Sequence, residues 1–389
     1  MRILRLVALL IVFGWIGLTK AQVHVNDYAI GKRITFQSQV LDESRDLLIH
    51  LPPGYTTTTQ RYPVLYLLDG ETHFVHACGS VDILTNSGII PPIIIVGIVN
   101  RNRNRDFTPV EVKRIPNSGQ YNKFCRFIRQ EVFPYIETTY RTEPYRILEG
   151  HSLGGMFSIH NLFSEPWMFQ AHLAISPALG YADGYVVNNL ISQSPHKLVF
   201  NNHLLAVSVG DEPGYYPLID SLSAIIQNRQ PQKLDYRYQH YSGETHGSVP
   251  VVSLYDGLKW VFKGWSIPDS IAEQGLPAIK QYHQSQFTER LGLSAAIPEP
   301  ILNRIGYQLI GNNKLQSALD VFAYNIELYP GSANVYDSYG EGLEQAGRLK
   351  EALDNYRKAV SVGEINHDPN LPIYRQHQEA LKIKKGLKE

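Results

Sequence analysis

The sequence of 389 residues has little cysteine and no excess of either charge. Lysine and arginine together number 36, as do aspartate and glutamate, so the formal net charge is zero. Nucleic-acid-binding proteins normally carry a basic excess that neutralises phosphates, so this class is disfavoured. The sequence also has no Cys/His set with zinc-binding spacing, no phosphate-binding loop and no dinucleotide fingerprint. We therefore predict neither a cofactor nor a metal.

The only two cysteines are Cys78 and Cys125. Two cysteines do not make a disulfide framework, and their separation in space cannot be read from the sequence. An oxidising compartment would permit a bridge between them. The simpler interpretation is two buried thiols.

Long apolar runs are also scarce, and the clearest one lies at the N-terminus. Arg2 and Arg5 precede an uncharged, largely apolar run of 13 residues, Leu6 to Leu18. A helix of this length rises only about 20 Å, which is short of the roughly 30 Å hydrocarbon core of a bilayer. The next residues, Thr19-Lys20-Ala21, offer small side chains where a signal peptidase would cleave. We predict a signal peptide over residues 1–21 and an exported mature protein, periplasmic or secreted, without a membrane span.

Residues 22–268 alternate between strand-like and helix-like patterns. Residues 64–68 and 93–98 are short continuous apolar runs, which is typical of strands buried on both faces of a parallel sheet. Residues 122–140 instead carry apolar side chains at helical spacing. This alternation predicts an α/β fold with a mostly parallel central sheet and helices on both faces.

A repeat with a period of 34 residues follows this region, with Gly306 recurring as Gly340. A helix–turn–helix unit of this length resembles the tetratricopeptide repeat. Such modules usually bind other proteins, but two repeats could also simply brace the preceding domain. The predicted parts are a linking or docking segment at residues 269–296, two repeats at 297–367 and a helical tail at 368–389.

The main chemical motif is Gly150-His151-Ser152-Leu153-Gly154-Gly155, between a predicted strand at residues 145–149 and a predicted helix. Glycines two residues before and after a serine permit the sharp strand-to-helix turn that exposes a nucleophilic hydroxyl. The N-terminus of the following helix supplies free N–H groups and a partial positive charge for an oxyanion. We predict Ser152 as a nucleophile. The alternative is a glycine-rich turn that only packs.

A serine nucleophile needs a base, and in folds with this turn the acid and then the histidine follow the serine along the chain. His246 is the preferred base because it lies in a loop between a predicted strand ending at Tyr241 and a predicted helix from Val249. After the preceding strand, Glu212 is the preferred acid and Asp211 the alternative. Both carboxylates could instead cap the following helix.

An oxyanion would require two backbone donors. We predict the N–H groups of Leu153 and of Glu71, the latter from the loop after the strand at residues 64–68. The pair His73 and His76 could indicate a metal, but a loop at the mouth of the site is the preferred interpretation.

Three arginines follow the predicted strand at residues 93–98. They could bind an anionic or catechol-bearing substrate, or form a solvated loop with an internal Arg–Asp pair. The complete set of candidate substrate-binding residues is Arg101, Arg103, Arg105, His151 and Tyr181.

Together these motifs resemble the esterase family of α/β-hydrolases that groups esterase D, feruloyl esterases and siderophore esterases acting on enterobactin-like trilactones. The resemblance covers about residues 30–265 and excludes the helical repeats. It implies Ser152 as nucleophile, His246 as base and Glu212 as the carboxylate. Because siderophore esterases of the family can rely on a Ser–His pair with a weaker acid, Glu212 is the least constrained of the three. The motifs that carry the resemblance are Leu51-Pro-Pro-Gly-Tyr55, Tyr62-Pro-Val-Leu-Tyr-Leu-Leu-Asp-Gly70, Arg105-Asp-Phe-Thr-Pro109, Gly150-His-Ser-Leu-Gly-Gly155, Ser176-Pro177 and Glu244-Thr-His246.

The sequence therefore predicts an exported serine esterase that hydrolyses carboxylic esters through an acyl-enzyme. The resemblance implies siderophore-type esters as the substrate. One alternative is a feruloyl or acetyl carbohydrate esterase. The other is a non-catalytic hydrolase-like scaffold that binds a protein through its repeats. The complete set of serine, histidine and acid favours the enzyme.

Overall fold

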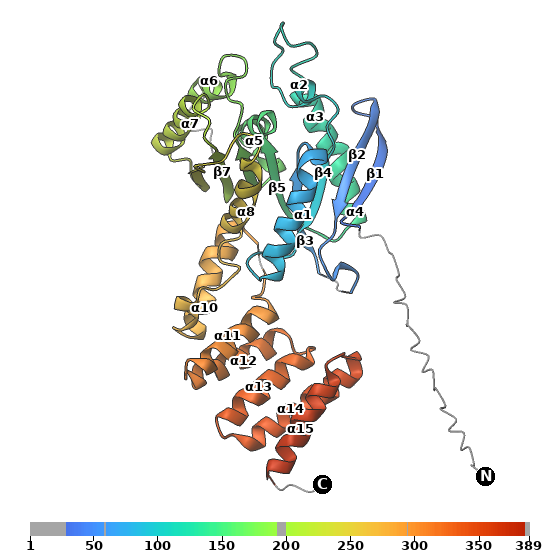
Figure 1. The fold of residues 1–389 in the computed structure, drawn as a ribbon, viewed down its shortest axis with the longest axis vertical. Coiled ribbons are helices and arrows are strands. Elements are labelled where there is room, and N and C mark those ends of the chain that lie inside the picture. The colour runs from blue at the N-terminus through green and yellow to red at the C-terminus, as the bar shows by residue number, and fades with distance from the viewer. Residues whose placement is uncertain (1–28, 58–59, 193–199, 294, 386–389) are drawn as a thin grey trace, which may run out of the picture.

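A computed structural model describes residues 29–57, 60–192, 200–293 and 295–385. The predicted signal peptide lies outside these ranges. Figure 1 shows two parts, a helix-flanked sheet and, below it, a stack of helices at the C-terminal end of the chain. Within the described ranges, no helix combines the length and the hydrophobicity needed to cross a membrane.

The first part is built on one eight-stranded sheet with the order β1-β2-β4-β3-β5-β6-β7-β8. All neighbouring strands from β4 to β8 run parallel, whereas β2 pairs antiparallel with both β1 and β4. This confirms the predicted mostly parallel sheet. The strands are β1 Lys32–Ser38, β2 Glu43–His50, β3 Tyr62–Leu67, β4 Ile94–Ile98, β5 Thr142–His151, β6 Ala171–Ile175, β7 His203–Val209 and β8 Leu234–His240.

Helices cover both faces of this sheet, as predicted. Every residue of the central strands β3, β4 and β6 is buried, which explains their continuous apolar sequences. The helices of this part are the 3-10 turn η1 Tyr55–Thr57, α1 Gly70–Asn86, α2 Arg103–Asp106, α3 Tyr121–Phe127, the π-helical turn η2 Ile128–Val132, α4 Phe133–Thr139, α5 Leu153–Ser164, the 3-10 turn η3 Pro166–Met168, α6 Tyr185–Ser192, α7 Tyr216–Arg229 and α8 Val249–Val261.

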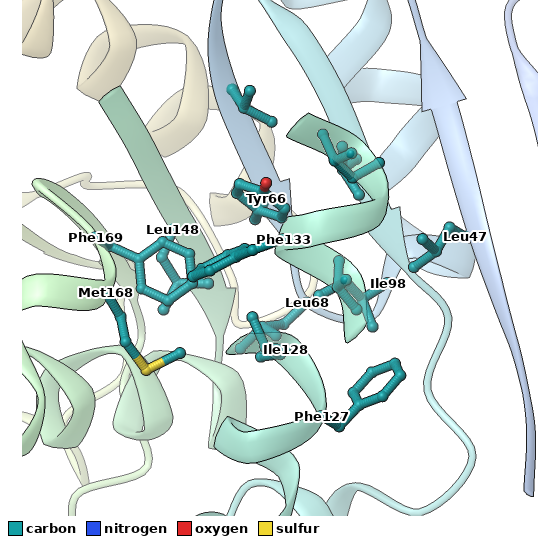
Figure 2. Packing of buried hydrophobic residues seen from close by; sticks show 14 of the residues in the cluster. Leu47, Tyr66, Leu68, Ile98, Phe127, Ile128, Phe133, Leu148, Met168 and Phe169 are labelled. Carbon is teal, nitrogen blue, oxygen red and sulfur yellow. The ribbon is translucent and has the colours of Figure 1, made fainter. Parts of the chain in front are cut away.

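Side chains of β3 alternate between the two cores. Tyr66 packs with α4 on one face, where its ring centroid lies 5.1 Å from that of Phe133 and 5.7 Å from that of Phe169 (Figure 2). Leu65 and Leu67 belong to the core on the other face, together with residues of α1 and α8. The strand is therefore held from both sides, which fixes the position of the loop that follows it.

Helix α1 corrects the expectation of a loop around His73 and His76. Its residues include Thr, His, Val and Gly, which favour helices weakly, and the N-cap residue Asp69 makes no side-chain capping bond. Burial of one face against the sheet stabilises the helix instead, with Phe74, Ala77 and other residues at helical spacing.

Both cysteines are free and buried. Cys125 belongs to the core that contains α3 and α4, whereas Cys78 belongs to the core that contains α1 and α8. The two thiols therefore lie on opposite faces of the sheet, which excludes a bridge between them in this fold.

The C-terminal part contains two helical hairpins, α11–α12 and α13–α14. A Cβ atom on Gly306 would lie 2.3 Å from the Phe322 ring, and one on Gly340 would lie 2.6 Å from the Tyr356 ring. Both contacts are related by the 34-residue period, so each glycine allows one helix of its hairpin to approach an aromatic ring of the other. The helices of this part are α9 Asp269–Ala272, α10 Leu276–His283, the π-helical turn η5 Gln284–Glu289, α11 Glu299–Gly311, α12 Leu315–Leu328, α13 Ala333–Gln345, α14 Leu349–Asn366 and α15 Leu371–Lys385.

The segment predicted to link or dock is largely helical. Ile279 of α10 is fully buried in one cluster with Ile305 of α11 and Phe322 of α12. Phe287 of η5 instead packs in the sheet's core with residues of α8. This segment therefore contacts both parts of the chain.

We expect Gly340→Ala to destabilise the protein by about 1–3 kcal/mol, because the added methyl group would overpack the Tyr356 ring. Gly311→Ala is the matched control, since a Cβ on this helical glycine meets no atom within 4 Å. Urea unfolding followed by circular dichroism would measure both. Equal stabilities of the two variants would contradict the proposed contact.

Candidate active site

Ser152 occupies a sharp turn between β5 and α5. Its backbone angles are φ 59° and ψ −115°, a left-handed conformation that is unusual for a residue with a side chain. The Ser152 N–H donates to the Ile175 carbonyl at 2.9 Å, and the Ser152 carbonyl accepts from the Ala178 N–H at 2.9 Å. The turn is therefore fastened to the end of β6, and the side chain remains partly exposed.

Two of the three glycines around Ser152 are sterically required. A Cβ on Gly150 would lie 2.2 Å from the Gly154 carbonyl oxygen, and one on Gly155 would lie 2.8 Å from the Ile175 oxygen. A Cβ on Gly154 would meet Leu68 at 3.5 Å, an ordinary contact. Gly154 was predicted to be the second glycine that the turn requires, but the close backbone approach occurs at Gly155.

His246 lies in the loop between β8 and α8, where it contacts the acid Glu212. The distance from His246 Nδ1 to Glu212 Oε2 is 2.5 Å. The other carboxylate oxygen of Glu212 accepts bonds from the Ser176 hydroxyl at 2.6 Å and the Gly210 N–H at 3.2 Å. Burial alone would raise the pKa of Glu212, but the hydrogen bonds from Ser176, His246 and Gly210 outweigh it and lower the pKa. The carboxylate is thus charged and held in place beside the imidazole.

Asp211, the alternative acid, lies elsewhere. Its carboxylate is half exposed, accepts from the Gly243 N–H at 2.7 Å and lies 2.9 Å from His240 Nε2. The Asp211 N–H also donates to the Glu244 carbonyl at 2.7 Å. Asp211 thus joins the acid loop to the histidine loop, and the structure brings Glu212, not Asp211, to His246.

The ring of His246 also contacts two aromatic neighbours. Its centroid lies 4.4 Å from that of His151 and 5.3 Å from that of Tyr215. His151 directly precedes the nucleophile candidate, so this contact brings the histidine loop to the Ser152 turn. The Ser152 hydroxyl forms no hydrogen bond with any residue in the described ranges, and catalytic bonds of this kind are often long until substrate binds.

The two predicted oxyanion donors stand at the starts of neighbouring helices. Leu153 is the first residue of α5 and Glu71 the second residue of α1, and both helices follow adjacent parallel strands, β5 and β3. No acceptor among the described residues is bonded to either N–H group. A Cβ on Gly154 would lie 3.6 Å from Asp69 Oδ2, so the two helix starts are in close proximity. Both N–H groups are available to an anion.

A cavity of about 280 Å³ adjoins this turn and has no charged side chain in its lining. Tyr181 contributes to the wall and is fixed there by a 2.8 Å bond from its hydroxyl to the Val110 carbonyl. A larger cavity of about 580 Å³ lies at the opposite edge of the sheet, beside Tyr62 and α11. The chemistry around Ser152 identifies the smaller cavity as part of the site. Its main lining residues are Leu153, Pro177, Leu179, Tyr181, Tyr215 and Leu218.

Comparison with known proteins finds esterases and a serine hydrolase among the similar proteins. Residues 38–201 match a family model described as "Putative esterase". The chain is 28% identical over 227 residues to the ferri-bacillibactin esterase BesA of Bacillus subtilis, covering 51% of this chain and 78% of that relative. A solved structure, the IroE-like serine hydrolase from Shewanella oneidensis, matches with a TM-score of 0.66 and 26% identity over 77% of this chain and 99% of its own.

The chain has an α/β-hydrolase fold and is a serine hydrolase that acts on ester bonds.

The helical part of the esterase also has a structural counterpart. An uncharacterised protein from Capnocytophaga ochracea matches 91% of this chain and 99% of its own length, with a TM-score of 0.61 and 16% identity. At this identity the match shows the fold alone. Such coverage extends beyond the sheet and includes helices after Glu299.

The three arginines of the esterase have different environments. Arg105 donates to both oxygens of Glu43, at 2.6 and 3.0 Å, and to Asp106 at 2.7 Å. These bonds engage its guanidinium within the protein, so its contacts do not support the predicted role in substrate binding. Arg103 contacts Asp69 and a backbone carbonyl, whereas Arg101 is exposed.

The predicted His73–His76 pair lies on α1 near the site. His73 Nδ1 lies 3.0 Å from His76 Nε2. Burial and, to a lesser degree, the charges of His76 and Arg103 lower the pKa of His73 to about 4. Burial similarly lowers the pKa of His151 to about 3, followed by the effect of His246. His73 and His151 are therefore neutral near pH 7.

One group of metal-capable side chains occurs within the described ranges, and it lies away from the site. Asp337 and Glu341 on α13 face His377 on α15, with ligand atoms within 4.8 Å of one another. His377 Nδ1 is 3.0 Å from Asp337 Oδ2, so the group already forms a side-chain contact between two helices.

Several groups support the site in roles that were not predicted from the sequence, although Ser176 was part of a motif named there. Ser176 carries the second bond to Glu212, and Tyr215 contacts the His246 ring. Glu149 is fully buried directly before the nucleophile motif, and neither of its carboxyl oxygens has a hydrogen-bond partner among the described residues. The signal for Glu149 in the sequence was a carboxylate directly after the apolar pair Ile147-Leu148 and directly before the Gly150 motif.

We expect Glu149→Gln to change how stability depends on pH. Burial, and secondarily the charge of Asp69, raise the pKa of Glu149 well above its usual value. In the unfolded chain the pKa of Glu149 is 4.5, so above this pH the unfolded chain loses the proton before the folded chain does. The contribution of Glu149 to wild-type stability therefore falls as pH rises. Glutamine has nearly the same shape and does not ionise. The melting temperature of the Glu149→Gln protein should therefore match that of wild type near pH 5 and exceed it by several degrees near pH 8. A change of ~1 kcal/mol in the free energy of unfolding shifts the melting temperature by about 2–4 °C.

Thermal melts followed by circular dichroism at the two pH values would test this expectation. Glu111→Gln is the control, because Glu111 is exposed. A Glu149→Gln protein that is less stable than wild type at both pH values would show that the carboxyl is ionised and partnered.

Proposed function

We propose that the protein is an exported esterase that cleaves siderophore-type carboxylic esters through an acyl-enzyme on Ser152. The observation that carries the catalytic assignment is the chain of contacts Ser176–Glu212–His246, which ends beside the strained Ser152 turn. A packing turn would not require a buried, charged carboxylate bonded to a loop histidine. The arrangement matches the roles of nucleophile, base and orienting acid.

In this mechanism the Ser152 hydroxyl attacks the ester carbonyl while His246 Nε2 accepts its proton. Glu212 accepts the Nδ1–H bond, fixes the tautomer of the imidazole and stabilises its charged form. The N–H groups of Leu153 and Glu71 bind the oxyanion of the tetrahedral intermediate. His246 then protonates the leaving alcohol, and a water molecule activated by the same histidine hydrolyses the acyl-enzyme.

The substrate class is supported by the relatives and by the site. Two relatives are named for siderophores, BesA and the siderophore triacetylfusarinine C esterase of Aspergillus fumigatus. The Aspergillus protein is 24% identical to this chain, and the match covers 54% of this chain and 84% of the relative. The uncharged cavity between Leu153 and Tyr181 would accommodate an apolar or aromatic group of such an ester. Arg101 is exposed on the loop after β4 and would attract an anionic chelate.

Export is proposed from the N-terminal pattern of residues 1–21, with cleavage near Ala21. For the helical hairpins α11–α14 we propose the tetratricopeptide-like role of contacting a protein partner. Their 34-residue period and matched Gly–aromatic contacts support this assignment.

We expect Ser152→Ala and His246→Ala to lower kcat on a short-chain aryl ester by at least about 10³-fold, and Glu212→Gln by about 10²–10⁴-fold. Asp211→Asn, the matched comparison for the acid, should retain kcat within about fivefold because Asp211 does not contact His246. Steady-state kinetics on folded, purified variants would measure these effects. Full activity of Ser152→Ala would refute the nucleophile, and a larger loss in Asp211→Asn than in Glu212→Gln would reassign the acid.

The substrate class is tested by comparing kcat/KM of wild type on a catecholate trilactone and on a feruloyl ester. We expect the trilactone to be preferred by at least about tenfold, which corresponds to ~1.4 kcal/mol of transition-state binding. The reverse preference would favour the carbohydrate esterase alternative.

A further inference from the structure

Arg103 lies between the two strand-to-helix turns that precede the oxyanion donors. Its Nε donates to Asp69 Oδ1 at 2.9 Å, and its Nη2 donates to the His151 carbonyl at 3.1 Å. The Asp69 side chain is only 6% exposed, whereas that of Arg103 is 40% exposed. One guanidinium thus spans from the end of β3 to the end of β5.

The two acceptors are directly connected to the proposed oxyanion donors. The His151 carbonyl belongs to the peptide bond that enters Ser152, one residue before Leu153. Asp69 is the N-cap of α1 and stands two residues before Glu71. Both acceptor residues are therefore within two positions of a donor N–H group.

Residues 69–71, which include the acceptor Asp69 and the donor residue Glu71, are held by few other interactions. Asp69 adopts φ 51° and ψ 46°, a left-handed conformation that costs about 1–3 kcal/mol unless its surroundings enforce it. Gly70 packs against the backbone of β4, where a Cβ would lie 2.6 Å from Gly97. Glu71 Oε2 accepts a bond from the Asn100 N–H at 2.9 Å. These contacts connect residues 69–71 to β4 and the loop that follows it. Among the side-chain hydrogen bonds that these three residues make within the described ranges, only the bond from Asp69 to Arg103 leads on to the nucleophile turn.

We propose that Arg103 is a positioning residue that aligns the two halves of the oxyanion hole by joining Asp69 to the His151 carbonyl. This inference rests on the proposed function, since it requires Ser152 to form a tetrahedral oxyanion. It replaces the expected role of Arg103 in substrate binding, because two edges of the guanidinium are already engaged by the protein. A lysine could not take the role over, since a single ammonium lacks the planar fork that reaches two acceptors in fixed directions.

The bridge acts on the transition state more than on the ground state. A ground-state ester carbonyl interacts weakly with the hole, whereas the oxyanion requires both N–H groups at bonding distance. Misalignment of one donor should therefore lower kcat and leave KM nearly unchanged. A substrate-binding arginine would give the opposite pattern.

The test uses the full-length mature protein and the variants Arg103→Met, Arg103→Lys and Asp69→Asn. Arg33→Met is the matched control, because the Arg33–Asp46 ion pair on β1 and β2 also measures 2.9 Å. For each protein we would measure kcat and KM on an aryl ester, and Ki for a trifluoromethyl ketone. In the inhibited complex a bond forms between Ser152 Oγ and the ketone carbon, the hydroxyl proton moves to His246, and the ketone oxygen becomes the oxyanion.

We expect Arg103→Met to lower kcat by about 10–100-fold and to change KM by less than about threefold. The upper end of this loss corresponds to the removal of one oxyanion donor. The Ki for the ketone should rise by the same factor as kcat falls. Arg103→Lys should not restore kcat, and Asp69→Asn should show a smaller loss of the same kind. The double variant Arg103→Met/Asp69→Asn should be no worse than Arg103→Met alone, because both changes break one bridge. Arg33→Met should behave as wild type.

The alternative results are distinct. A rise in KM with unchanged kcat in Arg103→Met would identify a substrate-binding residue and overturn the inference, as would unchanged kinetics. If Arg103→Met does not fold by circular dichroism, Asp69→Asn decides alone through the same comparison of kcat, KM and Ki. A folded wild type without ester hydrolysis would refute the proposed function, and this inference with it.

Discussion

The active site depends on one backbone constraint, the left-handed turn at Ser152 between β5 and α5. An L-residue is strained in this conformation. The turn can form because glycines on both sides of Ser152 have no side chain that would clash with the nearby backbone. Gly150 approaches the Gly154 carbonyl and Gly155 approaches the end of β6 too closely for a Cβ atom. These approaches let the Ser152 backbone bond to β6 while α5 starts at the next residue. The serine hydroxyl and the free N–H of Leu153 consequently stand together at the edge of the sheet.

The parallel sheet explains why distant segments meet at this edge. The segments after β3, β5, β6, β7 and β8 all leave from the same edge of the sheet. They carry Glu71, Ser152, Ser176, Glu212 and His246 respectively. Each loop is then tied to its neighbour, for example by the Asp211 N–H bond to the Glu244 carbonyl. The site is thus rigid where catalysis needs fixed dipoles.

Buried polar groups accompany this arrangement. Glu149 and Asp69 lie in low-dielectric surroundings that raise the pKa of both groups, that of Asp69 to about 6. Such groups are normally costly to bury, and active sites are where this cost is tolerated. Arg103 partly compensates Asp69, which links the electrostatics of the site to its geometry.

Much of this architecture could be predicted from the sequence because the signals were local. Continuous apolar runs identified β3 and β4, and the Gly-x-Ser-x-Gly pattern between a strand and a helix identified the turn. Helix α1 was missed because its stabilisation comes from packing against the sheet and not from its residue propensities.

Choosing between Asp211 and Glu212 required three-dimensional information, since adjacent residues of one loop point to different partners, His240 and His246. The hydrogen-bond partners of Arg103 and Arg105 could not be predicted either, because Asp69 and Glu43 are far from these arginines in the chain.

The most direct test of the account is covalent trapping with a fluorophosphonate, followed by intact mass and peptide mapping. Ser152 and Ser176 both lie near the His246–Glu212 pair, so the position of the adduct is informative. The account predicts one adduct per chain, located on Ser152 and absent in His246→Ala. A folded wild-type protein that is not labelled, or that is labelled on Ser176 or another serine, would contradict it.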